Sequence, residues 1–562
     1  MVNIPHLNKV EKSLKELVIL QFNCYILANN YVKLVPQRNM LKTAFINAKI
    51  FTSDRSNPWA EALVTCGSRI LFCGPGNDAA GYIDSETSVT DMFGKFLMPG
   101  IIDSHVHLVW GGSMLLQLDL AAVFSKADFI DHVTQYAAYN SNTWILGGRW
   151  NEQNWPGKEF PTKAWVDAVT PETPLLLHRM DYHAALANSC ALALAGITAA
   201  TPDPVNGSID RDEEGNPTGI LRDDAILLVA NLIPPMDEIA LTSAINATCK
   251  ELRKHGITSV HDISVPEQIP VLKKLEKEGT LGCRVFCRLP IYTMTDYISG
   301  NKALPKATEK ISCGSFKVFA DGSLGSSTAY FFDDYTDAPG NHGIPMEILK
   351  SGELQHLAEI ANNAGLQLSI HAIGDRVNSE LIDLFEKTFA GQVNTNRHRI
   401  EHVQHIRKPD IHRFSKCGLI ASVQPHHLFH DGPWMENRIG TVRLAEAYAF
   451  RSMLDAGIKL CFGSDFPIVT CNPFPAIETA VNRTVNDASG SVITPEERIT
   501  VEEALYAYTI DAAYAEFAEN NKGSLSAGKL ADFIILDKDP TAISVDELHT
   551  IKVERVFFDG LE

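Results

Sequence analysis

The chain has 562 residues, three to four times the roughly 150 residues of one domain, so several domains or one large barrel with attachments are expected. Hydrophobic residues make up 45% and charged residues 21% of the chain, as in ordinary globular proteins, which excludes a mainly disordered, collagen-like or coiled-coil protein. The 68 Asp and Glu outnumber the 49 Lys and Arg, and the net charge of −19 argues against nucleic acid or an anionic membrane surface as the main partner.

Cysteine usage and hydropathy indicate the compartment. The eleven cysteines are scattered without a CxxC spacing, which favours reduced thiols. No apolar run approaches the roughly 20 residues that cross a bilayer, and polar residues interrupt the apolar patches of residues 17–28, as they would not in a signal peptide. We therefore expect a soluble, cytoplasmic protein. Residues 1–40 are interpreted as an N-terminal extension that is either loosely attached and disordered, not translated at all, or functional.

Both ends of the chain have the sequence pattern of small sheets. Residues 42–96 consist of short β-branched and aromatic runs broken by Gly, Asn, Asp and Pro, which is typical of antiparallel strands, and residues 522–562 repeat this pattern. We expect the segments 41–97 and 522–562 to pair into one composite β-sandwich domain.

Between the two ends, apolar strand-like runs alternate with helical patterns, which indicates βα units around a parallel sheet. Eight such runs can be placed, the number that a (β/α)₈ barrel requires. They are residues 96–108, 257–262, 284–289, 315–321, 366–375, 398–404, 419–425 and 458–465. The barrel is expected over residues 98–521. The stretch from about 110 to 250 is too long for a βα connection, so we interpret it as an insertion after the first barrel strand.

Polar residues stand at the ends of several of these runs. His105 and His107 are two apart on the first expected strand, so both imidazoles point to the same face, which in a barrel is the interior. His371, His402 and Asp465 each end a later run. Because the carboxyl ends of barrel strands meet at one rim, four histidines and a carboxylate there predict a divalent metal site.

A single histidine among nineteen is more often structural, and His255, His261, His398 and His405 are interpreted in this way. The ordered set of HxH, Lys, His, His and Asp on the first, fourth, fifth, sixth and eighth runs is much harder to reach by chance.

The run PGIIDSHVHL resembles the signature of the amidohydrolase superfamily. Further stretches, among them FKVFADGSLGSSTAY, HAIGD, RIEHVQH and GSDFPI, resemble its YtcJ-like branch, which includes N-substituted formamide deformylase. The resemblance runs in order from residue 43 to residue 562. It implies an α/β fold, a (β/α)₈ TIM barrel with a β-sandwich domain formed from both chain ends, and one or two divalent metal ions, usually zinc.

Carried over by motif, the metal ligands implied by the resemblance are His105, His107, His371, His402 and Asp465. Lys317 of FKVFADGS matches a lysine that becomes carboxylated and bridges two metals. The alternative for Lys317 is an ammonium group that bends away to pair with a carboxylate such as Asp321. The motif QPHH leaves open whether His426 or His427 matches the family histidine.

The expected chemistry is hydrolysis by metal-activated water. Asp465 would accept the proton of the water and deliver it to a leaving nitrogen, so the favoured substrate is a small N-acyl or N-formyl amine rather than a peptide. The same site would also suit a cyclic amide hydrolase, a deaminase or an esterase, and a non-catalytic family member is the alternative from another class. The substrate, the metal and its number, and the oligomeric state, for which a homodimer is one candidate, stay open.

Overall fold

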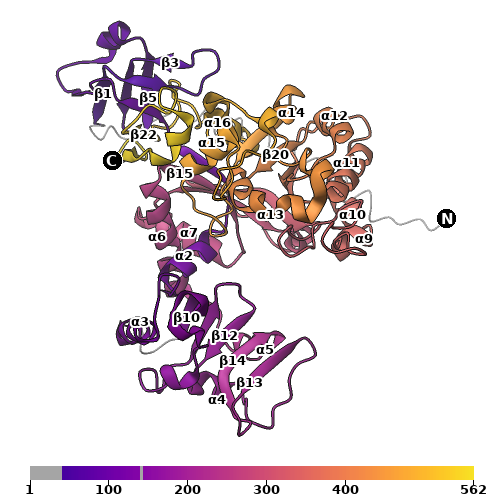
Figure 1. Ribbon diagram of the computed structural model, residues 1–562. Helices are drawn as coiled ribbons and strands as arrows, with labels where there is room; N and C mark the ends of the chain where they lie inside the picture. Colours follow the sequence, from indigo (N-terminus) through magenta and orange to yellow (C-terminus); the bar gives the residue numbers. More distant parts are fainter. Residues whose placement is uncertain (1–40, 140–143) are drawn as a thin grey trace. The chain divides into compact units, whose positions relative to one another are not determined.

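The computed structural model describes residues 41–139 and 144–562, so the expected extension of residues 1–40 lies outside the described residues. The described chain divides into two compact units (Figure 1). One contains residues 41–107 and 249–562, and the other is the inserted segment Leu108–Thr248. Across the described residues, no helix is both long enough and apolar enough to cross a membrane.

The first unit is built around an eight-stranded parallel sheet that follows the chain in order, which confirms the expected barrel fold. Its strands are β8 (Ile101–Val106), β15 (Ile257–Ile263), β16 (Arg284–Pro290), β17 (Ile311–Phe319), β18 (Gln367–Ala372), β19 (Arg399–His402), β20 (Ile420–Val423) and β21 (Lys459–Phe462). Two backbone hydrogen bonds connect the first strand to the segment after the last one. The N–H of Asp465 donates to the carbonyl of His105 at 2.7 Å, and the N–H of His107 donates to that of Phe466 at 2.9 Å.

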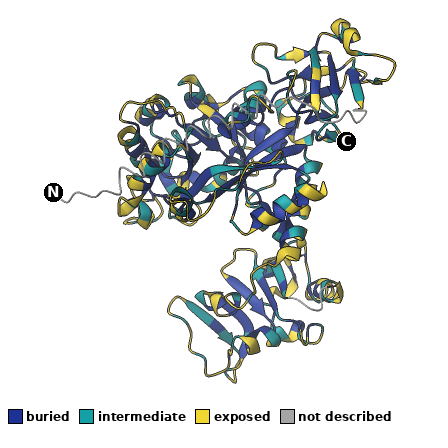
Figure 2. Cartoon of the chain, turned by 180° about the vertical axis from the view of Figure 1, so that it is seen from behind, coloured by how far each residue is buried: buried dark blue, intermediate teal, exposed yellow. Residues whose placement is uncertain are grey.

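Amphipathic helices surround the barrel, with buried faces toward the strands and exposed faces outward (Figure 2). The main ones are α7 (Gln268–Glu278), α10 (Glu353–Asn363), α11 (Asp375–Phe389), α12 (Lys408–Lys416), α13 (Pro425–Leu444), α14 (Phe450–Asp455), α15 (Pro473–Asn482), α16 (Val501–Ala507) and α17 (Ile510–Ala515). Residues 346–365 contain two helices, α9 (Glu347–Lys350) and α10. Gly352 between them has φ +78°, a left-handed conformation that ends the first helix.

The two chain ends share one sheet, as expected. A five-stranded sheet has the order β23–β22–β7–β2–β3, so the C-terminal strand β22 pairs with the N-terminal strand β7. In Figure 1 the yellow C-terminal segment with β22 lies beside the indigo N-terminal strands. These strands are β2 (Lys49–Phe51), β3 (Trp59–Ala60), β7 (Phe96–Pro99), β22 (Phe533–Leu536) and β23 (Val553–Phe557). The rings of Phe533 and Phe557 stack at 4.3 Å between centroids, and Phe45 packs edge-on against both at 5.1 Å.

A second, four-stranded sheet completes this domain, with the order β5–β4–β1–β6. Its strands are β1 (Lys42–Ile46), β4 (Ala62–Cys66), β5 (Arg69–Gly74) and β6 (Ser88–Asp91). The expectation of purely antiparallel pairing was wrong, because β1 pairs with β6 in parallel and β2 with β7 in parallel. In each parallel pair, the chain between the first and the second strand is long enough to return to the starting end of the sheet, so both strands run in the same direction.

The inserted unit has its own six-stranded sheet, in the order β13–β14–β12–β11–β10–β9. The strands are β9 (Leu118–Asp119), β10 (Ile145–Trp150), β11 (Leu175–Arg179), β12 (Ala184–Ala187), β13 (Gly207–Arg211) and β14 (Pro217–Asp223). Along β11, Leu175 and Leu177 belong to one hydrophobic cluster with Phe129 of α3 (Lys126–Tyr139), whereas Leu176 belongs to another with Leu192. This alternation gives the unit a core on each face of its sheet.

Candidate metal centre

The two histidines of the HxH motif converge on one carboxylate. His105 is the penultimate residue of β8 and His107 follows its end. The Nε2 atoms of both rings lie 3.3 Å from Oδ1 of Asp465. This oxygen is buried and has no hydrogen-bond partner within residues 41–139 and 144–562. Two imidazole nitrogens and a carboxylate oxygen that face one another in this way have the chemistry of a divalent metal site.

His402 joins His105 and Asp465 in one group of possible metal ligands. One ligand atom each of His105, His402 and Asp465 lies within 4.8 Å of the others. His402 is the last residue of β19, where adjacent side chains would normally point to opposite faces of the sheet. Its φ of +75° breaks this alternation, so that Glu401 and His402 both reach His105. Asp465, with φ +61°, also occupies the left-handed region, which non-glycine residues rarely adopt.

His371 and Lys317 lie beside this group. His371, on β18, packs its ring at 4.4 Å between centroids from that of His402, and its Nε2 lies 3.0 Å from the carbonyl oxygen of Gly322. If Nε2 donates to that carbonyl, Nδ1 is the nitrogen available to a metal. Lys317, on β17, is buried, and its Nζ lies 4.9 Å from the ring centre of Phe319. Among the described residues, this Nζ has no hydrogen-bond partner.

Lys317 does not pair with Asp321 in the structure, so the alternative interpretation of this lysine is wrong. The buried carboxylate of Asp321 instead accepts backbone N–H groups of Tyr330, Ile373 and Gly374 at 2.9 to 3.0 Å. It therefore ties the loop after β17 to the end of β18. Burial raises the pKa of Asp321 to about 7, although these three hydrogen bonds oppose the shift.

Burial sets the protonation of the imidazoles. It lowers the pKa of His105 to about 3 and that of His371 to about 4, and it holds the pKa of His402 well below its ordinary value. Neutral imidazoles are the form that binds metals. Burial alone would raise the pKa of Asp465, but the nearby histidines, His105 foremost, hold it well below its usual range.

Burial also lowers the pKa of Lys317 to about 7, with a smaller contribution from Arg288 in the same direction and an opposing one from Glu401.

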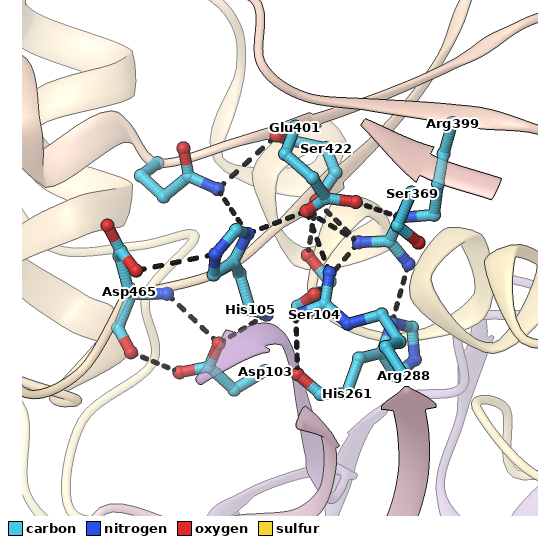
Figure 3. A network of polar contacts seen from close by, with 12 residues as sticks. Asp103, Ser104, His105, His261, Arg288, Ser369, Arg399, Glu401, Ser422 and Asp465 are labelled. Carbon is cyan, nitrogen blue, oxygen red and sulfur yellow. Dashed lines mark hydrogen bonds and ion pairs between the residues drawn. The ribbon is translucent and has the colours of Figure 1, made fainter. Parts of the chain in front are cut away.

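Sequence reasoning missed Glu401, which contacts Nδ1 of His105, the ring nitrogen that faces away from Asp465. Its Oε2 lies 2.6 Å from Nδ1 of His105 (Figure 3). The signal was present in the run HRIEHVQ, because a carboxylate inside a buried strand must have a partner. Burial would raise the pKa of Glu401, but Arg399, Arg288 and His105 hold it well below its ordinary value.

A cavity of about 400 Å³ opens beside these residues. His371, His402 and Asp465 line it together with His427, whose Nε2 lies 3.8 Å from Oδ2 of Asp465. His426, the other histidine of QPHH, instead stacks on Phe429. His427 is therefore the histidine of that motif that faces the candidate site. The volume suits a small molecule.

The cavity has an apolar and a polar part. Leu324, Ile373, Ile468 and Val469 supply aliphatic side chains. The polar lining residues include Gln404, His430 and Asp431, and the carboxylate of Asp431 accepts a hydrogen bond from Gln404 at 3.1 Å. A ligand could therefore place an apolar group and a hydrogen-bonding group in the same cavity.

Comparison with known proteins identifies relatives over most of the chain. A model of the amidohydrolase family matches residues 88–561. Protein LONG AFTER FAR-RED 3 of Arabidopsis thaliana is 38% identical over 87% of this chain and 86% of its own length. The putative amidohydrolase YtcJ of Bacillus subtilis is 31% identical over 85% and 91%, and N-substituted formamide deformylase of Arthrobacter pascens is 27% identical over 92% and 97%.

Among solved structures, an uncharacterized metal-dependent hydrolase from Pyrococcus horikoshii superposes with a TM-score of 0.76. It is 28% identical in sequence, and the match covers 90% of this chain and 99% of that one.

Proposed function

The chain belongs to the amidohydrolase family, and from this membership and the geometry of the barrel rim we propose that it is a metal-dependent hydrolase of carbon–nitrogen bonds other than peptide bonds. The favoured substrate class is an N-acyl or N-formyl amine. The observation that carries the proposal is the approach of His105 Nε2 and His107 Nε2 to the same otherwise unpartnered oxygen of Asp465.

The residues at the rim fit one or two divalent ions. The proposed ligands are His105, His107, His371, His402 and Asp465, with carboxylated Lys317 as a bridging ligand. The buried, neutral imidazoles of His105, His371 and His402 and the unpartnered carboxylate oxygen of Asp465 are groups that bind zinc. When bound, such an ion supplies Lewis acidity, which makes water reactive at neutral pH and polarises a carbonyl group.

Asp465 is the proposed proton carrier. It lies between the HxH motif and the cavity, where it can accept a proton from the attacking water and return it to the leaving nitrogen. His427, on the cavity side of Asp465, is placed to donate a hydrogen bond to the substrate. The aliphatic side chains of Leu324, Ile373, Ile468 and Val469 would hold the acyl or amine substituent and exclude bulk water.

N-substituted formamide deformylase, by its name, acts on N-substituted formamides, and its 27% identity over 92% of this chain supports the amide class. The test is elemental analysis of the purified protein combined with a screen of N-formyl amines, N-acyl amines, cyclic amides, amidines and esters. We expect release of a carboxylic acid and an amine from the first two classes. Turnover confined to the esters would show that the proposed bond class is wrong, and turnover confined to the cyclic amides or amidines would show that the favoured substrate class is wrong. A protein that neither contains nor takes up a divalent ion would remove the metal mechanism.

A further inference from the structure

The buried carboxylate of Glu401 constrains one of the proposed metal ligands. Its Oε2 lies 2.6 Å from Nδ1 of His105, and both side chains are almost completely excluded from solvent. A carboxylate can only accept a hydrogen bond, so Nδ1 must be the protonated nitrogen and Nε2 keeps its lone pair. The amide nitrogen of Gln424 also lies near Nδ1, at 3.3 Å, but the shorter, charge-assisted contact decides the tautomer.

Two arginines prevent the carboxylate from turning. Nε of Arg399 donates to Oε1 of Glu401 at 2.6 Å, and Nη2 of Arg399 lies 3.2 Å from Oε2. Nη1 of Arg288 lies 2.9 Å from the same Oε2. Both guanidinium groups are fully buried. Figure 3 shows Arg288 and Arg399 beside Glu401. Glu401 is therefore held on three sides, and only its contact with His105 leads to the rim.

The network continues into the barrel interior. Arg399 donates to the carbonyl of Ser104 at 2.8 Å and contacts Nδ1 of His261 at 2.8 Å. Nε2 of His261 lies 3.3 Å from Glu516, and Glu516 pairs with Lys522 at 2.7 Å. A chain of charged and polar side chains thus connects the segment after α17 with His105.

Stability alone is a poor explanation for this arrangement. The interior of such barrels is usually packed with branched apolar side chains, and buried ion pairs often contribute no more stability than apolar residues of the same size. Directly below His105, however, charges replace apolar packing. Carboxylates that bind the second nitrogen of a metal-ligating histidine fix its ring orientation.

We propose that Glu401 is a positioning residue, which fixes His105 in the Nδ1–H tautomer with Nε2 turned toward Asp465 and thereby sets the affinity and geometry of the metal site. Arg288 and Arg399 hold Glu401 in place. This inference rests on the proposed function, because a positioning role requires that the site binds a metal.

The test compares Glu401→Gln with the matched variant Glu516→Gln. Both substitutions neutralise a buried carboxylate of the same network, but Glu516 contacts none of the proposed ligands. Zinc dissociation constants from chelator competition, visible spectra of the cobalt-substituted proteins and thermal unfolding of the metal-free proteins are measured for wild type and both variants. We expect Glu401→Gln to weaken zinc binding about 10- to 100-fold and to change the cobalt spectrum, whereas Glu516→Gln leaves both unchanged.

The outcomes separate the inference from the proposed function. If wild type binds zinc and the two variants match it in affinity and spectrum, Glu401 is only structural and the proposed hydrolase stands. If wild type binds no divalent ion, both fail.

Glu401→Gln can also prevent folding, so a second measurement uses the wild-type protein. Long-range proton–nitrogen correlation spectra of protein labelled with ¹⁵N-histidine, assigned with His105→Gln, report which nitrogen of His105 carries the proton. We expect Nδ1–H in the metal-free and the zinc-loaded protein. An Nε2–H tautomer in the metal-free protein would overturn the inference.

Discussion

Asp103 accepts two hydrogen bonds from Ser464, one from its backbone N–H at 2.9 Å and one from its hydroxyl group at 2.6 Å. Ser464 directly precedes Asp465, and the same Asp103 oxygen that binds the Ser464 N–H accepts the backbone N–H of His105 at 3.0 Å. One buried carboxylate on β8 therefore fixes where the HxH strand and the segment bearing Asp465 lie relative to each other.

We predict that Asp103→Ala lowers kcat about 10-fold or more in protein that still folds, because a small misplacement of reacting groups is costly. The lost hydrogen bonds should also destabilise the protein by about 1–3 kcal/mol. Turnover and thermal unfolding are measured in parallel. Ser53→Ala is the control, because it removes the buried 2.8 Å hydrogen bond with Thr509 away from the site and should lower stability alone. Unchanged kcat in Asp103→Ala would assign Asp103 a purely structural role.

Removal of the metal should reduce both activity and stability. A ligand that binds only the folded protein stabilises it, by about 2.7 kcal/mol when present at 100 times its dissociation constant. Dialysis against a chelator is expected to abolish turnover and to lower the unfolding temperature, and added zinc should restore both.

In the double variant His105→Ala, His107→Ala, added zinc should restore neither turnover nor the unfolding temperature. As a control, His398→Gln should keep the metal, because His398 stacks on Phe385 and accepts the backbone N–H of Leu368 at 3.0 Å. Turnover that survives complete chelation would contradict the metal mechanism.

Asp465→Asn tests the proton-transfer role. Asparagine has nearly the same size and can remain beside the imidazoles, but it cannot accept the proton, so kcat should fall about 10²-fold or more while folding and most of the metal are retained. Steady-state kinetics and elemental analysis check this. The control is Asp410→Asn, which neutralises a buried carboxylate of α12 held by Arg407 and Arg413 and should leave kcat unchanged. Near wild-type kcat in Asp465→Asn would assign the proton transfer to another group.

The features that repeat along the chain could be predicted from sequence. The eight barrel strands lie in apolar runs with polar residues near their ends, and the two-residue spacing of His105 and His107 indicates that both imidazoles point to the same face. That both reach Asp465 is a finding of the structure. The pairing of the two chain ends was also predictable, because both ends have the same alternation of short strands and turns.

Contacts that depend on closure of the barrel could not be predicted. Glu401 and His105 are 296 residues apart, and no local pattern indicates that they touch. The alternation rule would place Glu401 and His402 on opposite faces, and only the left-handed backbone of His402 brings both to the same ring. The partner of Asp321 was likewise unpredictable, since it depends on how two loops pack.

The junction between the β-sandwich and the barrel should be sensitive to truncation. Arg284 on β16 pairs with Asp532 at 2.6 Å and also with Asp559, and residues 523–562 supply β22 and β23. Their deletion would expose the edge of β7 and leave Arg284 buried without its partners, so we predict aggregation in expression trials. Deletion of residues 1–39 is the control and should be harmless. A soluble, active protein without residues 523–562 would contradict this prediction.

At the same junction, the pairing of Asp559 with Arg284 and Lys310 should stabilise the folded protein, and acid should remove this contribution. Burial raises the pKa of Asp559, but Arg284 and Lys310 outweigh it and hold the pKa below its ordinary value. A lowered pKa in the folded state stabilises the protein above the unfolded value of about 3.9, and this contribution is lost as the pH falls through the folded pKa. Thermal unfolding below about pH 4 should therefore depend less steeply on pH in Asp559→Asn than in wild type. Identical slopes would exclude the contribution.

Two buried lysines provide the comparison for the carboxylation of Lys317. Nζ of Lys522 contacts Glu516 at 2.7 Å and Ser259 at 2.5 Å, so its ammonium group is paired. Lys317 has no such partner among the residues that the structure describes, and a buried unpaired ammonium is costly. A neutral amine at this position can add carbon dioxide and release one proton. The carbamate that forms offers two oxygens as metal ligands. We therefore expect carboxylation at Lys317 and not at Lys522.

Carbon-13 spectra of the zinc-loaded protein equilibrated with ¹³C-bicarbonate should contain one slowly exchanging carbamate signal that Lys317→Ala removes. This variant should lose part of its metal and most of its turnover, because a ligand is missing. A short carboxylate such as acetate or propionate at high concentration should restore some activity by occupying the space of the carbamate. Chemical rescue that works equally well in His371→Ala would show that the anion acts elsewhere. An unmodified ammonium group at Lys317 in metal-replete protein would contradict the bridge and leave a site built from the four histidines and Asp465.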